Sequence, residues 1–454
     1  MQEKWHKYLT RSAPRYTSYP SALHFNTAVG PKEYRAALEN IGLYEPISIY
    51  IHIPFCTQLC WYCGCNMRVE NDPERARPYL QAVIAEIKQV GEILRGRGVV
   101  SQIHFGGGTP NYFAPKDLRN ILDQVEQSIG FTDKSPVCME LDPRLCTSEG
   151  IHELAAIGIT RMSLGVQDFD PKVQEAINRV QSFEMVEACV SAMREAGVED
   201  VSFDLLYGLP LQNADSFVDS LRKTISLSPE RISLFGYAHL PQKILHQRLI
   251  RDDDLPSPVA RADLAVLADK AFLAAGYQCI GFDHFAKPET AIARAAQEGR
   301  LARNFQGFTE DKAKNVIGFG PSAISQIHGL LAQNAKYISD YQQAIGEGQL
   351  ATQKGVEASS VEQRLGDWID GLLCRQQADL SDWHEIAAPD DSEWQGLCAQ
   401  LRRFEADDLI VLAAGQITIR PEARAFSRLI AAVFDPSFAK QRKERSAKAF
   451  SRAI

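Results

Sequence analysis

The amino-acid sequence predicts an α/β fold, a (βα)6 partial barrel with an N-terminal arm and a mostly helical C-terminal domain. From about residue 46, short segments rich in β-branched and aromatic residues alternate with longer segments of helical period. This alternation is typical of βα units and a parallel sheet. A chain of 454 residues is also too long for one small domain, and a large barrel with flanking parts accounts for its length.

The six expected strands are 47–53, 101–105, 137–141, 161–166, 201–206 and 231–235. The helix after the first strand is readable from Leu80, Val83, Ile84, Ile87 and Leu94, whose spacing places them on one face. Further helices are expected over 115–129, 171–196, 213–227 and 259–275. A doubly wound open sheet is the competing topology.

Three parts follow along the chain. Residues 1–45 form an arm that carries the Pro- and Tyr-rich stretch 14–20, which has no clear period. Residues 46–334 form the barrel, and residues 335–454 form the C-terminal domain. Within this domain, 409–434 is expected to hold two strands around a Gly-containing turn and then a helix, as in a winged-helix-like module.

Composition limits the classes of partner. The formal net charge of -8 argues against a general nucleic-acid binder, because phosphate neutralisation requires a basic surface. The N-terminus has no apolar signal region, and no run of about 18 apolar residues occurs. We therefore expect a cytoplasmic protein with neither a membrane nor a nucleic-acid partner, and we expect a monomer.

Four of the 10 cysteines lie in one short loop after the first strand, at Cys56, Cys60, Cys63 and Cys65. Soft thiolate ligands select zinc, copper(I) or iron–sulfur clusters. Structural zinc normally uses two separated ligand pairs, and a second pair at suitable spacing is missing. The spacing favours a cluster, with zinc or redox thiols as alternatives. Three protein ligands would leave one iron of a [4Fe–4S] cluster open to a small molecule.

Polar residues gather where the predicted strands end, which is where βα barrels place their active sites. The cysteine loop follows strand one and Gly106–Pro110 follows strand two. The later strands end on or carry Glu140, Asp142, Gln167, Asp168, Asp204 and the segment 237–239.

These polar residues also have plainer interpretations. The glycine run lets backbone approach a ligand closely, or it is only a tight turn. Glu140, Gln167 and Asp204 suit ribose hydroxyls or an ammonium group, or they cap helices and loops.

Two basic side chains, Arg179 and His52, also have two interpretations each. Arg179 would grip a carboxylate in bidentate fashion or remain a solvated arginine at a helix end. His52 would move a proton near the cluster or serve as a structural histidine.

The C-x3-C-x2-C loop at the end of the first strand resembles the radical S-adenosylmethionine superfamily, and nearly the whole chain resembles the oxygen-independent coproporphyrinogen III oxidases. The motifs that carry this resemblance are PRYTSYP (14–20), YIHIPFC and CWYCGC (50–65), HFGGGTPNYF (104–113), ELDPR (140–144), SLGVQDF (163–169), INRVQ (177–181), FDLLYGLP (203–210), YAHLP (237–241), DHFAKP (283–288), RNFQGF (303–308) and GFGPSAIS (318–325).

The resemblance implies that Cys56, Cys60 and Cys63 ligate a [4Fe–4S] cluster, and that Cys65 is needed for activity without ligating it. It implies two molecules of S-adenosylmethionine. The first would contact Tyr50, Gly107, Glu140 and Ile324. The second would contact Tyr62, Gly108, Thr109, Gln167, Arg179, Asp204 and Ala238. Cys65 and His52 are the expected catalytic residues.

The implied reaction begins with reductive cleavage of S-adenosylmethionine to a 5′-deoxyadenosyl radical, which removes a hydrogen from a propionate. Loss of carbon dioxide and one electron leaves a vinyl group, and two propionates of coproporphyrinogen III react to give protoporphyrinogen IX for haem synthesis. An electron donor such as flavodoxin or ferredoxin is expected. The arm, with Arg11, Arg15, Tyr16 and Tyr19, is expected to close over this tetra-anionic macrocycle.

Two rival functions remain at this point. A haem chaperone of the same superfamily would share the barrel without the oxidase activity, but that branch tends to lack the fourth cysteine and the PRYTSYP stretch. A zinc-stabilised interaction protein without catalysis is the rival from another class.

Overall fold

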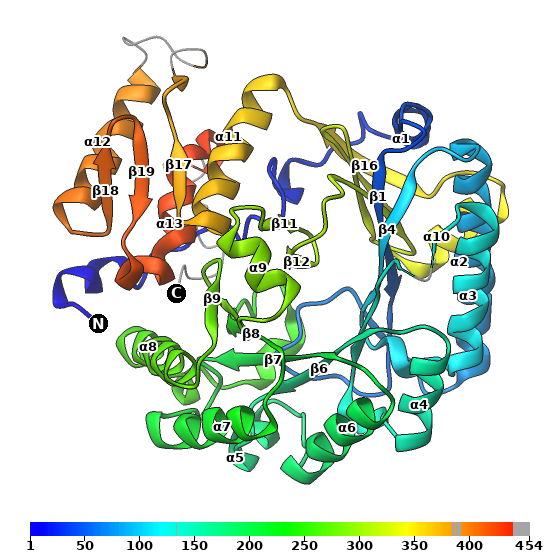
Figure 1. Cartoon of the computed structure of the whole chain (residues 1–454), viewed down its shortest axis with the longest axis horizontal. Helices are drawn as coiled ribbons and strands as arrows, with labels where there is room; N and C mark the ends of the chain where they lie inside the picture. The colour runs from blue at the N-terminus through cyan, green and yellow to red at the C-terminus, as the bar shows by residue number, and fades with distance from the viewer. Residues whose placement is uncertain (133, 384–385, 387–391, 439–454) are drawn as a thin grey trace.

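A computed structural model describes residues 1–132, 134–383, 386 and 392–438. Within them, a 12-stranded sheet curves around a lumen, and helices cover its outer face (Figure 1). The strand order is β16-β15-β14-β13-β1-β4-β5-β6-β7-β8-β10-β9.

Six parallel strands form the centre of this sheet and follow one another in chain order. They are β1 (Pro46–Ile53), β4 (Val99–Gly107), β5 (Val137–Leu141), β6 (Arg161–Gln167), β7 (Asp200–Tyr207) and β8 (Arg231–Gly236). A doubly wound sheet would reverse its order at a switch point, and this one does not. The prediction of a (βα)6 partial barrel is confirmed.

Helices α2 (Pro73–Leu94), α3 (Pro115–Ser128), α4 (Ser148–Ala156), α6 (Phe183–Glu195), α7 (Ala214–Leu227) and α8 (Pro258–Ala274) lie outside the strands (Figure 1). The single helix expected over 171–196 is wrong. Helix α5 (Pro171–Ala176) ends early, and Asn178 has a left-handed φ of 54° before α6 begins. The break has a structural cause, because this segment leaves the helix to hold the cysteine loop.

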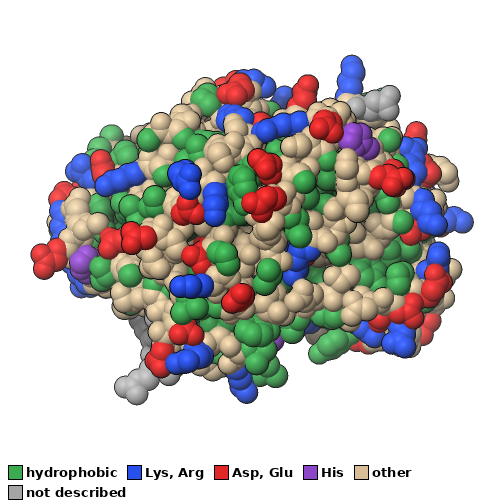
Figure 2. Space-filling view, turned by 90° about the horizontal axis from the view of Figure 1, so that it is seen from below, with side chains coloured by type: hydrophobic (Ala, Val, Ile, Leu, Met, Phe, Trp, Pro, Cys, Tyr) green, Lys and Arg blue, Asp and Glu red, His purple; other side chains and the backbone are tan. Residues whose placement is uncertain are grey.

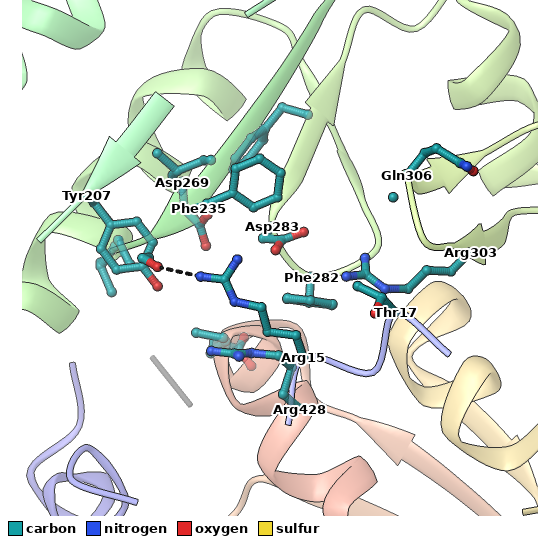
Figure 3. Close-up of a pocket in the computed structure, with 18 of the residues that line it drawn as sticks. Arg15, Thr17, Tyr207, Phe235, Asp269, Phe282, Asp283, Arg303, Gln306 and Arg428 are labelled. Atoms are coloured by element: carbon teal, nitrogen blue, oxygen red, sulfur yellow. Dashed lines mark hydrogen bonds between the residues drawn. The ribbon is translucent and has the colours of Figure 1, made fainter. Parts of the chain in front are cut away.

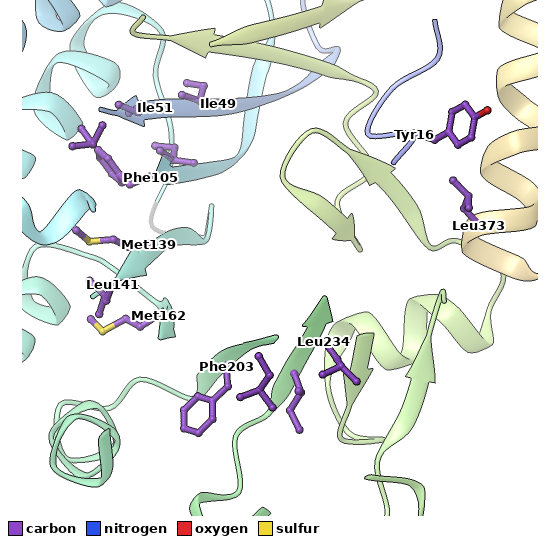
Figure 4. Close-up of a cluster of buried hydrophobic side chains, with 14 of the residues drawn as sticks. Tyr16, Ile49, Ile51, Phe105, Met139, Leu141, Met162, Phe203, Leu234 and Leu373 are labelled. Carbon is purple, nitrogen blue, oxygen red and sulfur yellow. The ribbon is translucent and has the colours of Figure 1, made fainter. Parts of the chain in front are cut away.

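Side chains alternate between the two faces of the barrel wall, as the period of a strand requires. Ile49, Ile51, Phe105 and Phe203 are fully buried under the helices (Figure 4). The opposite face carries polar pairs across neighbouring strands, including Tyr50 beside His104, Glu140 beside Ser163 and Asp204 beside Ser233. The lumen is therefore polar, which suits a cofactor cavity better than a packed core.

Further strands extend the sheet at both ends. Strand β13 (Asn315–Phe319) pairs in parallel with β1, and β14 (Ile324–Ile327), β15 (Leu330–Asn334) and β16 (Thr352–Glu357) continue antiparallel from it. At the other end lie β10 (His284–Ala286) and β9 (Gln278–Ile280). Because β16 belongs to the sheet, the sheet runs past residue 334, the expected end of the barrel.

Shorter elements follow β9 and β15 in the chain. They are α9 (Ala291–Gln297), the hairpin of β11 (Ala302–Asn304) and β12 (Gly307–Thr309), and α10 (Ile338–Gly346).

The C-terminal part is mostly helical, as expected. It contains α11 (Ser360–Asp370), η7 (Gly371–Arg375), α12 (Ser392–Ala406), η9 (Pro421–Phe426), α13 (Ser427–Ala431), η10 (Ala432–Phe434) and the small sheet of β17 (Gln377–Asp379), β18 (Ile410–Ala413) and β19 (Gln416–Ile419). The predicted hairpin is present, and Ala414 and Gly415 at its turn both have positive φ. Residues 384–385, 387–391 and 439–454 of the expected C-terminal domain lie outside the described residues.

The N-terminal arm contains η1 (Glu3–Tyr8), η2 (Ala22–His24) and the unpredicted helix α1 (Pro31–Glu39). Its first part packs on the C-terminal domain, where Trp5 Nε1 donates to the carbonyl of Asp407 at 2.8 Å. Tyr16 then donates to Asp435 at 3.1 Å, and its own carbonyl accepts from Arg303 Nε at 3.3 Å. The arm thus contacts both larger parts of the chain.

Acidic and basic side chains are interspersed over the face in Figure 2, in keeping with the modest net charge. None of the helices in the described part of the chain is long and apolar enough to cross a membrane.

Candidate active site

The cysteine loop lies at the carboxyl end of β1. It leaves through β2 (Phe55–Cys56) and returns through β3 (Arg68–Val69). The segment between α5 and α6 holds the loop from the side: Trp61 N–H donates to the carbonyl of Ile177 at 2.9 Å, and Asn178 donates to the carbonyl of Leu59 at 2.8 Å. The unusual backbone of Asn178 therefore has a structural role next to the cysteines.

Cys60 is buried beside two guanidinium groups. Arg179 Nη1 lies 3.5 Å and Arg144 Nη2 lies 3.6 Å from its sulfur. Asp142 holds both arginines, with contacts of 2.6 Å to Arg144 and 3.2 Å to Arg179. Burial raises the pKa of Asp142, but the hydrogen bond from Arg144 and the charge of Arg179 outweigh it and keep that pKa below its usual value.

Arg179 is 6% exposed and also donates to the carbonyl of Gly165 at 2.7 Å. The interpretation as a solvated arginine at a helix end is therefore wrong.

The other two expected ligands also have polar neighbours. Thr109 Oγ1 lies 3.3 Å from Cys56 Sγ, and the backbone N–H of Cys65 donates to Cys63 Sγ at 3.4 Å. The hydrogen bond from the Cys65 side chain lowers the pKa of Cys63 to about 7, which favours its thiolate. Burial raises the pKa of Cys56 to about 12, and the contact with Thr109 acts against this rise. Because each sulfur faces a hydroxyl, an amide N–H or a guanidinium, the loop fits an anionic group ligated by three thiolates.

Among the described residues, the cysteine loop gives no site for a single metal ion. In the described part of the chain, no three His, Cys, Asp or Glu side chains are close enough to hold a single metal ion. Zinc bonds sulfur at about 2.3 Å, so its ligands must surround one point closely. A four-iron cluster takes its thiolates at separate corners instead, so it does not need this close convergence.

The glycine run ends β4 beside the loop. A Cβ on Gly107, whose φ is 119°, would lie 2.7 Å from the His52 ring, and a Cβ on Gly108 would lie 2.7 Å from the carbonyl of Phe55. A Cβ on Gly106 would lie 2.8 Å from Glu140. Gly107 and Gly108 are required because β4 approaches β1 and the start of the cysteine loop closely, which supports the interpretation of the run as a place of close backbone approach.

Tyr50, Gly107 and Glu140 meet around His104. Glu140 Oε1 lies 3.2 Å from His104 Nε2, and Glu140 Oε2 accepts from the N–H of Gly107 at 3.1 Å. The Tyr50 ring stacks on His104 with centroids 5.9 Å apart. Ile324 adjoins this group through Gly318, the strand partner of Tyr50. The four residues expected at the first nucleotide thus lie in one region.

His52 has polar partners on both ring nitrogens, namely the Tyr50 hydroxyl at 3.0 Å and the carbonyl of Asn66 at 2.9 Å. Burial lowers the pKa of His52, which favours its neutral form. This geometry supports the structural interpretation, in which His52 fastens the end of the cysteine loop to β1.

Two sets of contacts bring together residues that are expected at the second nucleotide. A Cβ on Gly165 would lie 2.9 Å from Arg179 and 3.0 Å from Gln167 Nε2, so both side chains close over that glycine. Gln247 donates to the carbonyls of Tyr62 at 3.0 Å and Ala238 at 3.1 Å.

Asp204 lies on the lumen face of β7, where Ser163 Oγ donates to it at 3.3 Å. Burial, followed by the charge of Glu140, raises the pKa of Asp204 to about 6. Thr109 and Gly108 complete the set expected at the second nucleotide, next to Cys56.

Several residues of this region were given no role of their own from the sequence. Asp142 and Arg144 stand in the ELDPR motif at the end of a predicted strand, so their position gave a usable signal. His104 follows the lumen-facing alternation of its strand. Gln247 and His246 belong to the short 3-10 helix η5 (Leu245–Leu249), and nothing in the sequence singles them out. His246 Nε2 lies 2.7 Å from the carbonyl of Cys63.

Comparison with known proteins agrees with this geometry. The sequence profile of the Radical SAM superfamily matches residues 50–224. The oxygen-independent coproporphyrinogen III oxidase of Pseudomonas aeruginosa is 40% identical over 441 residues, which cover 96% of each chain. The enzyme of the same name from Bradyrhizobium diazoefficiens is 38% identical and covers 93% of this chain and 94% of its own.

A solved structure is equally similar. The structure of coproporphyrinogen III oxidase (HemN) from Escherichia coli, described as a radical SAM enzyme, superimposes with a TM-score of 0.86 at 36% identity. The match covers 93% of this chain and 97% of the other. The chain therefore belongs to the oxygen-independent coproporphyrinogen III oxidase family of the radical SAM superfamily.

Proposed function

We propose that this protein oxidatively decarboxylates two propionate side chains of coproporphyrinogen III to vinyl groups, giving protoporphyrinogen IX in anaerobic haem biosynthesis. The observation that carries this proposal is the cysteine loop itself. A C-x3-C-x2-C-x-C loop lies at the carboxyl end of β1, in a chain that matches coproporphyrinogen III oxidases over 96% of its length.

The [4Fe–4S] cluster of this family would be held by Cys56, Cys60 and Cys63. The negative charge of these thiolates would be offset by Arg144 and Arg179, which Asp142 holds in place. The cluster and S-adenosylmethionine supply reductive cleavage and hydrogen abstraction when bound. The protein contributes position and exclusion of water. Cys65 would act as a catalytic residue without ligating the cluster.

Two S-adenosylmethionine molecules bind side by side in the lumen. Tyr50, Gly107, Glu140 and Ile324 contact the first, in the region around His104. The contacts of the second are Tyr62, Gly108, Thr109, Gln167, Arg179, Asp204 and Ala238. The contacts of the first set around His104 and the separate contacts at Gly165 and Gln247 support this division.

The cellular setting follows from the reaction. A monomer in the cytoplasm takes electrons from a carrier such as flavodoxin or ferredoxin and needs neither a nucleic acid nor a membrane.

The direct test is an anaerobic assay with coproporphyrinogen III, S-adenosylmethionine and a chemical reductant. We expect vinyl product and 5′-deoxyadenosine to form together. A protein that binds haem and forms no vinyl product would instead be a haem chaperone. A colourless anaerobic preparation that contains zinc without iron or sulfide would contradict the radical chemistry.

A further inference from the structure

A cavity lies where the N-terminal arm, the open end of the barrel and the C-terminal domain meet. Figure 3 shows Arg15 of the arm, Arg303 of β11 and Arg428 of α13 reaching toward the same space. Phe235 and Phe282 form part of its apolar wall. Guanidinium groups from three separate elements beside aromatic rings resemble a site for an anion attached to an apolar body.

Two of the three carboxylates in the wall have partners of their own, and one of these two, Asp283, also acts on the arginines. Asp269 pairs with Arg424 at 2.6 Å, and Asp283 contacts His284 Nδ1 at 2.7 Å. The third, Glu422, lies at the exposed start of η9. Asp283 therefore offsets part of the positive charge of Arg15, Arg303 and Arg428, while Asp269 is held by Arg424.

Arg15 and Arg428 also act on each other. Arg428 is 8% exposed, and burial, followed by the charge of Arg15, lowers its pKa to about 10. Holding two guanidiniums near one another under these conditions costs free energy, which a bound carboxylate would offset.

Two polar atoms of the wall have no hydrogen-bond partner among the described residues. They are Arg303 Nη1, a donor, and Gln306 Oε1, an acceptor, and both are buried. Buried polar atoms are nearly always paired, and a ligand that carries both a hydrogen-bond acceptor and a donor would pair these two. The Arg303 guanidinium lies over the rings of Phe282 and Phe308, at 5.1 and 4.6 Å, which keeps it in place.

This cavity adjoins the lumen where the nucleotides are expected. Phe235, Phe285 and Gln306 line both it and the lumen cavity that contains Glu140 and Asp204. A molecule anchored by the arginines would reach toward the reacting groups across Phe235 and Gln306.

We propose that this cavity binds the substrate by its carboxylates: Arg15, Arg303 and Arg428 receive propionates that are not reacting, and Gln306 accepts from a pyrrole N–H. The proposal rests on the proposed function and deepens it. A porphyrinogen supplies what the wall lacks, namely carboxylate acceptors, pyrrole N–H donors and an apolar ring system. The arm then serves as one wall of the substrate site through Arg15.

The test uses coproporphyrin III, the stable oxidised form that keeps all four propionates, and its uncharged tetramethyl ester. Binding to the cluster-loaded full chain is followed anaerobically by fluorescence. We expect Arg15→Gln, Arg303→Gln and Arg428→Gln each to raise the Kd for coproporphyrin III by about 10-fold or more. The Kd for S-adenosylmethionine should stay within about twofold of wild type.

The matched control is Arg222→Gln, because Arg222 is a surface arginine whose side chain is 75% exposed. It should bind coproporphyrin III like the wild type. Arg303→Lys, which keeps the charge but loses the fork of donors, should fall between wild type and Arg303→Gln. The ester should bind weakly to every variant.

Unchanged coproporphyrin III binding in the three glutamine variants would overturn the proposal, and so would an ester that binds as tightly as the acid. A variant that fails to fold loses S-adenosylmethionine binding too, and the comparison of acid with ester in the wild type then decides. If the wild type produces no vinyl product, the proposed function fails. If it does, and the glutamine variants keep the wild-type Kd, only the carboxylate site fails.

Discussion

Asp142 is the residue on which the surroundings of Cys60 depend. Its side chain is 5% exposed and holds two arginines that would otherwise repel each other. Removing one partner of a buried ionic group costs about 3–5 kcal/mol, because the remaining charges are left uncompensated. We therefore predict that Asp142→Ala lowers the free energy of unfolding by about this amount and reduces iron content, as measured by denaturant titration and metal analysis.

The control for this prediction is Asp219→Ala, which breaks surface pairs with Arg222 and Lys223. Its effect should remain below about 1 kcal/mol. Equal effects of the two substitutions would show that Asp142 has no special role.

Asp204 gives a prediction about pH. Its pKa of about 6 means that the carboxylate becomes protonated as pH falls through 6, and in the proposed site it would then be a weaker acceptor for a ribose hydroxyl. If only the ionised form binds, affinity for S-adenosylmethionine should fall about fourfold from pH 7.5 to 5.5. Titration calorimetry over this range should show the decrease in wild type and a flatter profile in Asp204→Asn.

At the scale of elements, the end of β4 is constrained by close approach. Gly107 combines a φ of 119° with a space that a Cβ would share with the His52 ring. We predict that Gly107→Ala destabilises the protein by about 3 kcal/mol or more, from backbone strain and overpacking together. The measurement is the free energy of unfolding.

Gly130 is the matched control, since its φ is also positive, at 88°, and nothing lies within 4 Å of the position of a Cβ. Gly130→Ala should cost only the backbone strain of about 1–2 kcal/mol. If both variants lose the same free energy, crowding against His52 does not explain the glycine.

The break between α5 and α6 shows where element prediction fails. Apolar spacing continues through 171–196, so periodicity predicts one helix there. The chain leaves the helix at Asn178 because the polar groups of residues 177–179 pair with the cysteine loop, more than 110 residues earlier in the chain. The residues around Asn178 do not by themselves indicate that this segment pairs with a loop so far away in the sequence. The six parallel strands, by contrast, were predictable because each is a short run rich in apolar residues with turn or loop residues at its ends.

At the scale of the whole molecule, the amino ends of the barrel strands carry a compact charge network. Glu310 accepts from Arg231 at 2.8 and 3.0 Å and also contacts Arg161, which pairs with Asp200 at 2.8 Å. Burial raises the pKa of Glu310, but Arg231 and then Arg161 outweigh it and hold that pKa well below the usual value. This end of a βα barrel serves stability rather than chemistry.

The pKa of Glu310 is lower in the folded than in the unfolded state, so its contribution is present above the unfolded value of about 4.3 and is lost as pH falls below it. We predict that Glu310→Gln lowers the free energy of unfolding by about 3 kcal/mol near neutral pH and weakens the acid-induced loss. Glu298→Gln removes an exposed ion pair with Arg300, so it should leave the free energy of unfolding and its loss in acid nearly unchanged. Identical acid denaturation of Glu310→Gln and wild type would contradict this account.

The sequence predicted the barrel and the arm as parts, but not the way in which they close on each other. Strand β13 lies beside β1 although more than 260 residues separate them, and its five residues are too short to stand out locally. The arginine cavity likewise draws Arg15, Arg303 and Arg428 from opposite ends of the chain. Of these, Arg15 was expected near the substrate. The cysteine loop could be predicted because its four cysteines lie close together in the sequence.

In the proposed site, three thiols of the loop ligate the cluster and the fourth, Cys65, is catalytic. The most direct measurement compares iron and sulfide content with vinyl product formation in Cys63→Ala and Cys65→Ser, both purified and assayed anaerobically. Cys63→Ala should lose the cluster and all turnover, whereas Cys65→Ser should keep a full cluster and lose turnover. A Cys65→Ser protein without its cluster, or one that still forms vinyl product, would contradict the account.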